Sequence, residues 1–310
     1  MGDGAFVILV NQVASMFVML AVGYALYRGG LVRDEGIGSL SNVVMFVASP
    51  ALTIEAFQAD FDAARLVSAA WCFGLTLALM ALAALLAKVV YRHHDDVVAR
   101  FGVVFSNMGF VGIPLVQSLL GTEYIFLISS CIAAFTLFAW TYGVLLISGG
   151  DRGQVSLRKV FTNPAVLAFF VGLALYVLCV SLPVPALLAV ESLGAMNTGL
   201  AMVVLDAYLA QADLGALLRD ASVYKVSLLR LVLVPVACSA VLALLPEAWV
   251  TFNARLVVLI AMATPLGAMT AMLASMYGAD YRHAAGTVSV STLLSLVTMP
   301  VVLTLGMAVL

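Results

Sequence analysis

The sequence predicts an all-α polytopic membrane protein with ten transmembrane helices, arranged as two five-helix repeats of inverted topology. The 310-residue chain is 64% hydrophobic and only 10% charged, and its mean hydropathy is +1.16. Soluble proteins carry about 25% charged residues, so a chain of this composition belongs in a bilayer. It divides into ten apolar segments, and two of them, in corresponding positions of the two halves, are interrupted near their centres.

A transmembrane helix needs about 20 mostly apolar residues. Charges, prolines and glycines separate ten segments of this kind, which span residues 5–27, 38–58, 66–90, 99–120, 124–147, 164–182, 187–210, 223–245, 254–277 and 285–309. The start of the chain lacks the basic region and cleavage site of a signal peptide, so the first segment is predicted to be a retained helix.

The basic residues predict the orientation. If the N-terminus lies outside, the cytoplasmic loops and helix ends collect Arg28, Arg33, Lys88, Arg92, Arg100, Arg152, Arg158, Lys159, Arg219, Lys225, Arg230 and Arg282. Of the 14 basic residues, only Arg65 and Arg255 then remain outside. The positive-inside rule therefore predicts a multi-pass protein of the cell membrane with both termini outside.

The longest connection between segments falls after the fifth one and predicts the domain boundaries. Residues 1–148 form the first five-helix repeat, residues 149–163 a cytoplasmic linker, and residues 164–310 the second repeat. Because five is odd, the second repeat enters the membrane in the opposite sense to the first. Two inverted halves of this kind are an architecture of secondary transporters.

The fourth and ninth segments carry the interruptions. Asn107, Gly109, Gly112 and Pro114 break residues 99–120, and the group Thr264, Pro265 and Gly267 breaks residues 255–277. Hydrocarbon cannot satisfy the backbone groups that a break exposes, so a helix that only anchors a protein gains nothing from it. Paired breaks in corresponding positions therefore predict a substrate site.

The chemistry of a broken helix favours an anionic substrate. The second half of such a helix begins with unpaired N–H groups and a positive dipole end. We find no basic residue near the centre of a segment, so an anion has to be held by these N–H groups. The Asn107 side chain is predicted to add a donor, the alternative being a bond between helices. Gly109 and Gly112 either shape the site or only permit close packing.

Other polar residues inside the segments allow two interpretations each. Thr287, Ser291, Ser295 and Thr298 form one stripe on the tenth segment, which either lines the cavity or bonds to backbone. Carboxylates inside a membrane are costly and count as functional by default. The candidates for coupling transport to an ion are Asp206, Glu55 and Glu191, although each lies near an end of its segment, where it could reach water. Arg230 is expected to extend its charge to the cytoplasmic surface.

The composition argues against several other classes of protein. A net charge of −2 leaves no basic surplus for nucleic acid. The cysteines lie inside apolar segments without CxxC spacing, which indicates buried thiols and no metal or other cofactor. The three histidines fall in loops, which disfavours a membrane-embedded enzyme, and the short loops leave no room for a signalling domain of a sensor or for the P-loop of an ATP-driven pump.

Several motifs, taken together over nearly the whole chain, resemble the auxin efflux carrier family, whose bacterial members include malonate and malate permeases. The fourth segment contains Asn107-Met-Gly109-Phe110-Val-Gly112-Ile-Pro114, followed by Gly121. The second half adds the motifs Asn163-Pro164, Leu200-Ala201-Met202, Tyr277-Gly278-Ala-Asp280, Ser291-Thr292-Leu-Leu-Ser295 and Thr298-Met-Pro300.

The resemblance implies that the fourth and ninth helices cross at their broken centres and bind a carboxylate there. We therefore expect a secondary transporter of small mono- or dicarboxylates that works by alternating access. A sodium-coupled carrier of bile-acid type, with a related ten-span plan, is the alternative. The expected partners are the organic anion and the bilayer, and a homodimer is left open.

Overall fold

The computed structural model describes residues 11, 14–15, 18–19, 21–92, 97–151, 153, 155, 157–211 and 219–310. Within these residues the fold is all-helical, as the composition and the apolar segments predicted. The single extended contact in them is an isolated antiparallel bridge between Ser106 and Leu266.

The helices of the first half correspond closely to the predicted segments. After a helical stretch at residues 21–28, they are α2 (Asp34–Val43), η1 (Val44–Ala48), α3 (Ser49–Ala56), α4 (Ala63–Val90), α5 (Val97–Val104), η3 (Met108–Gly112), α6 (Ile113–Leu120), η4 (Thr122–Tyr124), α7 (Ile125–Phe138), η5 (Ala139–Gly143) and α8 (Val144–Ile147). The elements η1, η3 and η5 are π-helical turns; η1 and η5 join the helices on both sides without a break, and η3 runs directly into α6.

The second half begins after the connecting segment, which contains the short helix α9 (Leu157–Phe161). Its helices are α10 (Pro164–Val177), α11 (Val184–Gln211), α13 (Ala221–Leu228), η7 (Leu229–Leu233), α14 (Val234–Ala243), α15 (Phe252–Ala263), α16 (Met269–Met276) and α17 (Tyr281–Val309). The π-helical turn η7 joins α13 to α14 in one continuous run.

Six helical stretches of the described residues are long and apolar enough to cross a membrane. They are Gly36–Ala56, Ala63–Val90, Thr122–Ile147, Val184–Val204, Ala221–Ala243 and His283–Val309. Three further apolar helices, Met108–Leu120, Pro164–Val177 and Phe252–Ala263, are shorter. Each lies within a predicted segment or begins two residues before it, and two of them belong to the broken fourth and ninth. About half of the first predicted segment lies outside the described residues.

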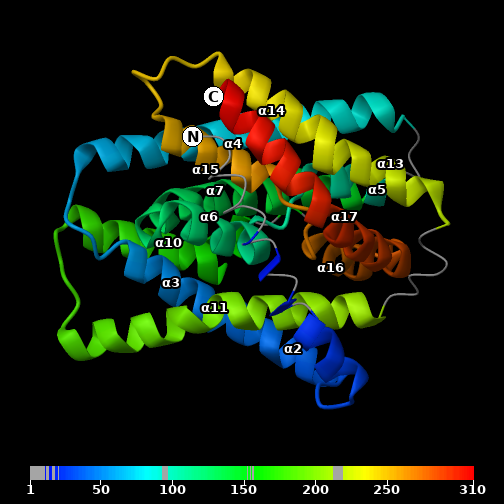
Figure 1. Cartoon of the computed structure of the whole chain (residues 1–310), viewed down its shortest axis with the longest axis horizontal. Coiled ribbons are helices and arrows are strands. Elements are labelled where there is room, and N and C mark those ends of the chain that lie inside the picture. Colours follow the sequence, from blue (N-terminus) through cyan, green and yellow to red (C-terminus); the bar gives the residue numbers. More distant parts are fainter. Residues whose placement is uncertain are drawn as a thin grey trace.

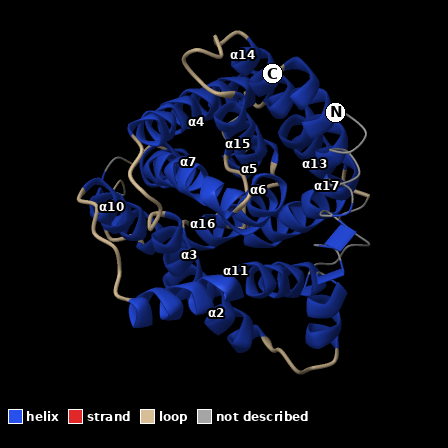
Figure 2. Cartoon of the chain, turned by 60° about the vertical axis from the view of Figure 1, so that its left-hand side comes forward, coloured by secondary structure: helices blue, strands red, loops and turns tan. Residues whose placement is uncertain are grey.

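The helices form two groups that face each other (Figures 1 and 2). In both views α2, α3, α10 and α11 lie together on one side of the molecule. The other group contains α4, α7, α13, α14 and α17 around the broken helices. The two groups meet where α3 and α10 pack against α7, and where α11 packs against η3 and α17. This boundary is where the candidate site lies.

Helix α15 is the centre of the larger group. Every residue from Ala254 to Ala263 is buried. A helix that is apolar on all sides is stable only when other helices surround it, and α15 packs against α4, α7, α14 and α17. Large apolar side chains on the outer faces are exposed instead, among them Leu85, Phe170, Leu188 and Leu305. This distribution fits a bundle whose outer surface contacts lipid.

The cysteines are all free, and three of them, Cys72, Cys131 and Cys238, are buried as predicted. Cys179 differs, because it is exposed in the turn that follows α10 and has a positive φ of 54°. The turn was not predicted because the residues around Cys179 are apolar and continue the pattern of the helix. The helix ends at Val177, five residues earlier than the predicted segment.

Asp220 caps the start of α13, and we predict that it makes a measurable, pH-dependent contribution to the stability of the fold. Its carboxylate accepts a hydrogen bond from the Ser222 N–H at 2.8 Å and lies 3.6 Å from His283 Nδ1 at the start of α17. Hydrogen bonds from Ser222 lower the pKa of Asp220, and the nearby His283 lowers it further. A carboxyl whose pKa is lowered by folding stabilises the fold above its unfolded pKa and loses this effect as the pH falls through the folded value.

We therefore expect the variant Asp220→Ala to lose about 0.5–2 kcal/mol of unfolding free energy near neutral pH, the usual effect of losing a helix cap. The difference from wild type should begin to shrink as the pH falls below the unfolded pKa of about 4, and should reach its minimum below the lowered folded pKa, where the wild-type carboxyl is protonated. Thermal unfolding in detergent at a series of pH values measures it. Asp220→Asn, which can still cap, is the control. A difference that stays constant with pH would contradict the role of the charge.

Candidate substrate site at the crossing of two broken helices

The two predicted breaks are present, and each is a short extended segment between two helices. In the fourth predicted segment, residues 105–107 separate α5 from η3 and α6. In the ninth, residues 264–268 separate α15 from α16, and Thr264 has the extended backbone angles φ −63° and ψ 152°. The first break lies earlier than the glycines and proline suggested. Gly109, Gly112 and Pro114 all belong to the helix that follows it.

The two extended segments cross and bond to each other through their backbones. The N–H of Asn107 donates to the carbonyl of Pro265 at 2.8 Å, and the N–H of Gly267 donates to the carbonyl of Phe105 at 2.9 Å. Two side chains add to this pairing. Ser106 donates to the Ala261 carbonyl at 2.9 Å, and Ser291 Oγ accepts from the Leu266 N–H at 3.2 Å. Backbone groups freed by the breaks therefore satisfy each other, which the interior of a membrane protein requires.

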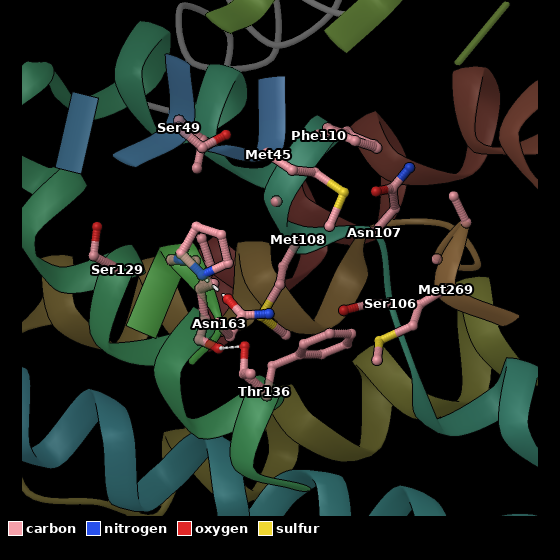
Figure 3. A pocket seen from close by; sticks show the side chains of 18 of the residues that line it. Met45, Ser49, Ser106, Asn107, Met108, Phe110, Ser129, Thr136, Asn163 and Met269 are labelled. Atoms are coloured by element: carbon pink, nitrogen blue, oxygen red, sulfur yellow. Dashed lines mark hydrogen bonds between the residues drawn. The ribbon is translucent and has the colours of Figure 1, made fainter. Parts of the chain in front are cut away.

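A cavity of about 230 Å³ lies beside this crossing, between the two groups of helices. The larger group contributes the crossing segments, α7 and α16, and the smaller group contributes α2, η1, α3 and the beginning of α10. The polar residues in its lining are Ser41, Ser49, Thr53, Ser106, Asn107, Ser129, Thr136, Trp140 and Asn163. Figure 3 shows Ser106 and Asn107 at one side of the cavity, and Thr136 and Asn163 at another. Among the described residues that line it, none is charged.

Three helices begin at this cavity. The helix η3–α6 begins at Met108, α16 begins at Met269, and α10 begins at Pro164, and all three of these residues line the cavity. The first N–H groups of a helix have no partners within it, and the helix dipole makes that end positive. At α10, the Asn163 side chain accepts one of them, from Ala165 at 3.0 Å. Three positive helix ends thus face the cavity, and the described residues that line it include no cationic side chain.

Asn107 is the buried side chain of the cavity without a partner. It is only 5% exposed, and the described residues offer its Nδ2 no hydrogen-bond acceptor. A buried amide without a partner costs about 1–3 kcal/mol, so such a group usually has a function. Among the described residues, no side-chain hydrogen bond of Asn107 supports the alternative prediction that it bonds two helices together.

Several residues predicted for the site lie close to the crossing but outside the cavity lining. Gly109 and Gly267 line the cavity, whereas Gly112, Pro114, Thr264, Pro265, Ser291 and Ser295 do not. The hydroxyls of the stripe on α17 bond to backbone carbonyls, which was the second of the two interpretations. Thr287, Ser291, Ser295 and Thr298 each donate to a carbonyl three or four residues earlier. Ser291 supports the crossing segment and does not line the cavity.

The carboxylates proposed for coupling lie elsewhere. Glu55, on the last turn of α3, is partly buried, and Glu191, on α11, is exposed. Neither lines the cavity. The side chain of Asp206 lies outside the described residues. The described residues also contain no group of three or more histidine, cysteine or acidic side chains that could hold a metal ion.

The prediction made for Arg230 was wrong. We expected its side chain to extend to the membrane surface, but it is completely buried in the turn η7. Its guanidinium donates to the carbonyls of Val103 and Val104, at the end of α5, and to those of Met262 and Thr264, at the end of α15. The sequence signal was a charge seven residues inside an apolar segment, and such a charge marks a functional position by default.

Other residues of the cavity carried weaker signals in the sequence. Asn163 precedes Pro164, and this pair is typical of a helix start. The hydroxyls of Ser49, Thr53, Ser129 and Thr136 lie on two helices, α3 and α7, that are far apart in the sequence, so no spacing along the chain connects them. Only the packing of α3 against α7 brings them together.

Membrane-length helices around a polar cavity, with broken helices crossing at its wall, are typical of a membrane transport protein. Comparison with known proteins agrees. The sequence model of the family described as "Membrane transport protein" matches residues 8–154 and again residues 151–303, so the chain belongs to this family. It is also 26% identical over 305 residues to an uncharacterized transporter of Methanothermobacter thermautotrophicus, covering 94% of this chain and 96% of that protein.

Proposed function

We propose that this protein is a secondary transporter of small organic anions, mono- or dicarboxylates, of the auxin efflux carrier type. The observation that carries the proposal is the cavity at the crossing, where three helices begin and none of the described lining residues is charged. Positive helix ends bind carboxylates and phosphates through backbone N–H groups. The binding energy of an anion then comes from dipoles that are already fixed in place, and no buried lysine or arginine has to face the cavity.

The size and lining of the cavity support a small substrate. A volume of about 230 Å³ is below the ~300–1,000 Å³ of sites for drug-sized ligands. Phe110, Ile132, Phe135 and several methionines supply apolar walls, which suit the short carbon chain of a carboxylate. A bile-acid molecule is much larger, so the volume favours a small anion over the sodium-coupled bile-acid alternative. Sodium-dependent uptake into vesicles separates the two.

The position of the cavity supports alternating access. It lies between two groups of helices, so a movement of one group relative to the other would open it toward either side of the membrane. In this mechanism the crossing moves as one unit with the larger group, because two backbone bonds and the Ser106 side chain join the two broken helices, and Ser291 of α17 bonds to one of them. Glu55, Glu191 and Asp206 remain candidates for coupling this movement to an ion.

The proposed topology is two inverted five-helix repeats, residues 1–148 and 164–310, joined by residues 149–163. Two matches to one family model, and two broken helices in corresponding positions, support the repeat. The basic residues predict both termini outside.

Cysteine labelling of intact cells tests the topology. Cysteines placed at Gly29 and His94 should react with a membrane-impermeant reagent only after the membrane is permeabilised, whereas a cysteine at Asp60 should react from outside. The background needs the exposed Cys179 replaced by serine. Labelling of all three positions from one side would contradict the ten-helix topology.

Thermal-shift measurements test the substrate class. A ligand that binds only the folded protein raises its melting temperature in proportion to the logarithm of concentration over Kd. Acetate, lactate, malonate, malate and succinate should be compared with uncharged amides of similar size, such as malonamide. We expect at least one carboxylate to stabilise the protein and its amide to have no effect. Equal shifts from a carboxylate and its amide would contradict an anion site.

A further inference from the structure

Arg230 contacts both broken helices just before the crossing without lining the cavity, and its surroundings are unusual for a charge inside a membrane protein. It is 0% exposed, inside the apolar run Ala221–Ala243. A charge in such a place is costly and normally has a carboxylate partner. Within the described residues Arg230 has none, and all of its hydrogen bonds go to backbone carbonyls.

The four carbonyls belong to two helix ends. Nη1 of Arg230 lies 3.1 Å from the Val103 carbonyl and 3.4 Å from that of Val104, where α5 ends. Nε lies 3.1 Å from the Thr264 carbonyl, and Nη2 donates to Met262, where α15 ends. The last carbonyls of a helix have no partners within it. One guanidinium therefore caps both broken helices, and it does so across the boundary between the two halves of the sequence.

Arg230 also balances the negative charge of the two helix ends that it caps. A helix C-terminus carries about −0.5 of an elementary charge, so two of them present about −1 to the guanidinium. A few residues further along the chain, after each break, η3–α6 and α16 present their positive ends to the cavity. Without a cation, the two negative ends would lie only a few residues from the two positive ones and weaken their attraction for an anion. With Arg230 in place, the negative ends are neutralised.

We propose that Arg230 is a positioning residue of the anion site, although it does not line the cavity. It holds the ends of α5 and α15 together, which fixes the crossing, and it neutralises their negative ends, which leaves the cavity electropositive. The inference rests on the proposed anion-binding function for its electrostatic part. The mechanical part, which concerns the crossing alone, is independent of any ligand.

The chain offers a matched control in Arg255. This arginine is also buried, at 4% exposure, but among the described residues its side chain donates to the Leu245 carbonyl at 3.4 Å, away from the crossing. The variants to compare are Arg230→Met, Arg230→Lys, Arg255→Met and Arg255→Lys. Lysine keeps the charge but is a point donor, so it cannot span two helix ends as the planar guanidinium does.

Hydrogen exchange on the ligand-free protein in detergent tests the mechanical part. The amides of Asn107 and Gly267 bond across the crossing, so peptides that contain them should exchange slowly in wild type. We expect faster exchange in both Arg230 variants and wild-type exchange in both Arg255 variants. Unchanged exchange in the Arg230 variants would overturn the inference. If Arg230→Met does not fold, Arg230→Lys alone gives the answer.

Malonate binding, measured by calorimetry on the folded fraction, tests the electrostatic part. We expect Kd to rise about tenfold in Arg230→Met, by a smaller factor in Arg230→Lys, and by less than about twofold in the Arg255 variants. Loss of stability in Arg230→Met with unchanged malonate affinity would reduce Arg230 to a packing role and overturn the proposal. If wild type binds neither malonate nor any other carboxylate, the proposed function fails, while hydrogen exchange still decides whether Arg230 holds the crossing.

Discussion

Replacing Gly267 with alanine is expected to disrupt the crossing and abolish transport. A Cβ atom at this position would lie 2.7 Å from the Ser106 carbonyl oxygen and 3.3 Å from that of Phe105. Both atoms belong to the backbone of the other crossing segment, so no side chain can turn away to make room. The same residue donates its N–H to Phe105, and separating the two segments would break this bond.

Overpacking of this kind costs about 1–3 kcal/mol of unfolding free energy. The loss of function should be larger, because the N–H groups at the cavity are placed by the crossing. Uptake of the best carboxylate of the thermal-shift series into proteoliposomes, with the melting temperature of the same sample, measures both effects.

Gly109→Ala is the matched control for Gly267→Ala. Gly109 also lines the cavity at the crossing, but a Cβ atom there would meet nothing within 4 Å. We expect this variant to fold with wild-type stability, and any change in uptake then reflects the shape of the cavity. A fully active Gly267→Ala protein would show that the close approach of the two segments is unnecessary for transport.

Replacing Asn107 with alanine is expected to weaken carboxylate binding without destabilising the protein. The side-chain Nδ2 has no acceptor among the described residues, so its removal breaks no bond within the fold. If it donates to a substrate carboxylate, the loss should be about 1–3 kcal/mol, or roughly 10- to 100-fold in Kd. Malonate affinity and melting temperature, measured on one preparation, distinguish the two effects.

Asn253→Ala is the control for Asn107→Ala. Asn253, at the start of α15, donates its side-chain amide to the hydroxyl of Tyr124 and does not line the cavity. Its replacement should lower the melting temperature and leave malonate affinity unchanged. If Asn107→Ala also lowers the melting temperature and keeps wild-type affinity, Asn107 is a structural residue and the proposed site is wrong.

The sequence alone predicted most of the helices, because apolar length and the positions of glycine, proline and charge are local properties. The two breaks were also predicted, although the first was placed a few residues too late. Gly109, Gly112 and Pro114 suggested an interruption at their own positions. The helix instead passes through them, starting with the π-helical turn at Met108, and the extended residues are 105–107.

The anionic substrate stays a prediction, which came from the absence of basic residues near the segment centres and from the N–H groups that a broken helix exposes. Which residues line the site could not be predicted from the sequence. The cavity is lined by three of the predicted residues, Asn107, Gly109 and Gly267. The hydroxyls of Ser291 and Ser295 instead donate to backbone carbonyls of their own helix. A serine in a helix can bond to the preceding turn or to a ligand, and only its neighbours determine which.

Two features were decided by the tertiary structure alone. The cavity unites hydroxyls and amides from α3, α7 and α10 with the crossing, and these elements are far apart in the sequence. Arg230 was visible as a charge in an apolar segment, yet its partners are backbone carbonyls, which every residue has and no sequence pattern marks. The sequence by itself determined where the helices are and where they break, because those properties depend on neighbouring residues. Which broken ends meet, and what neutralises them, depends on contacts between distant segments, and only the folded chain contains that information.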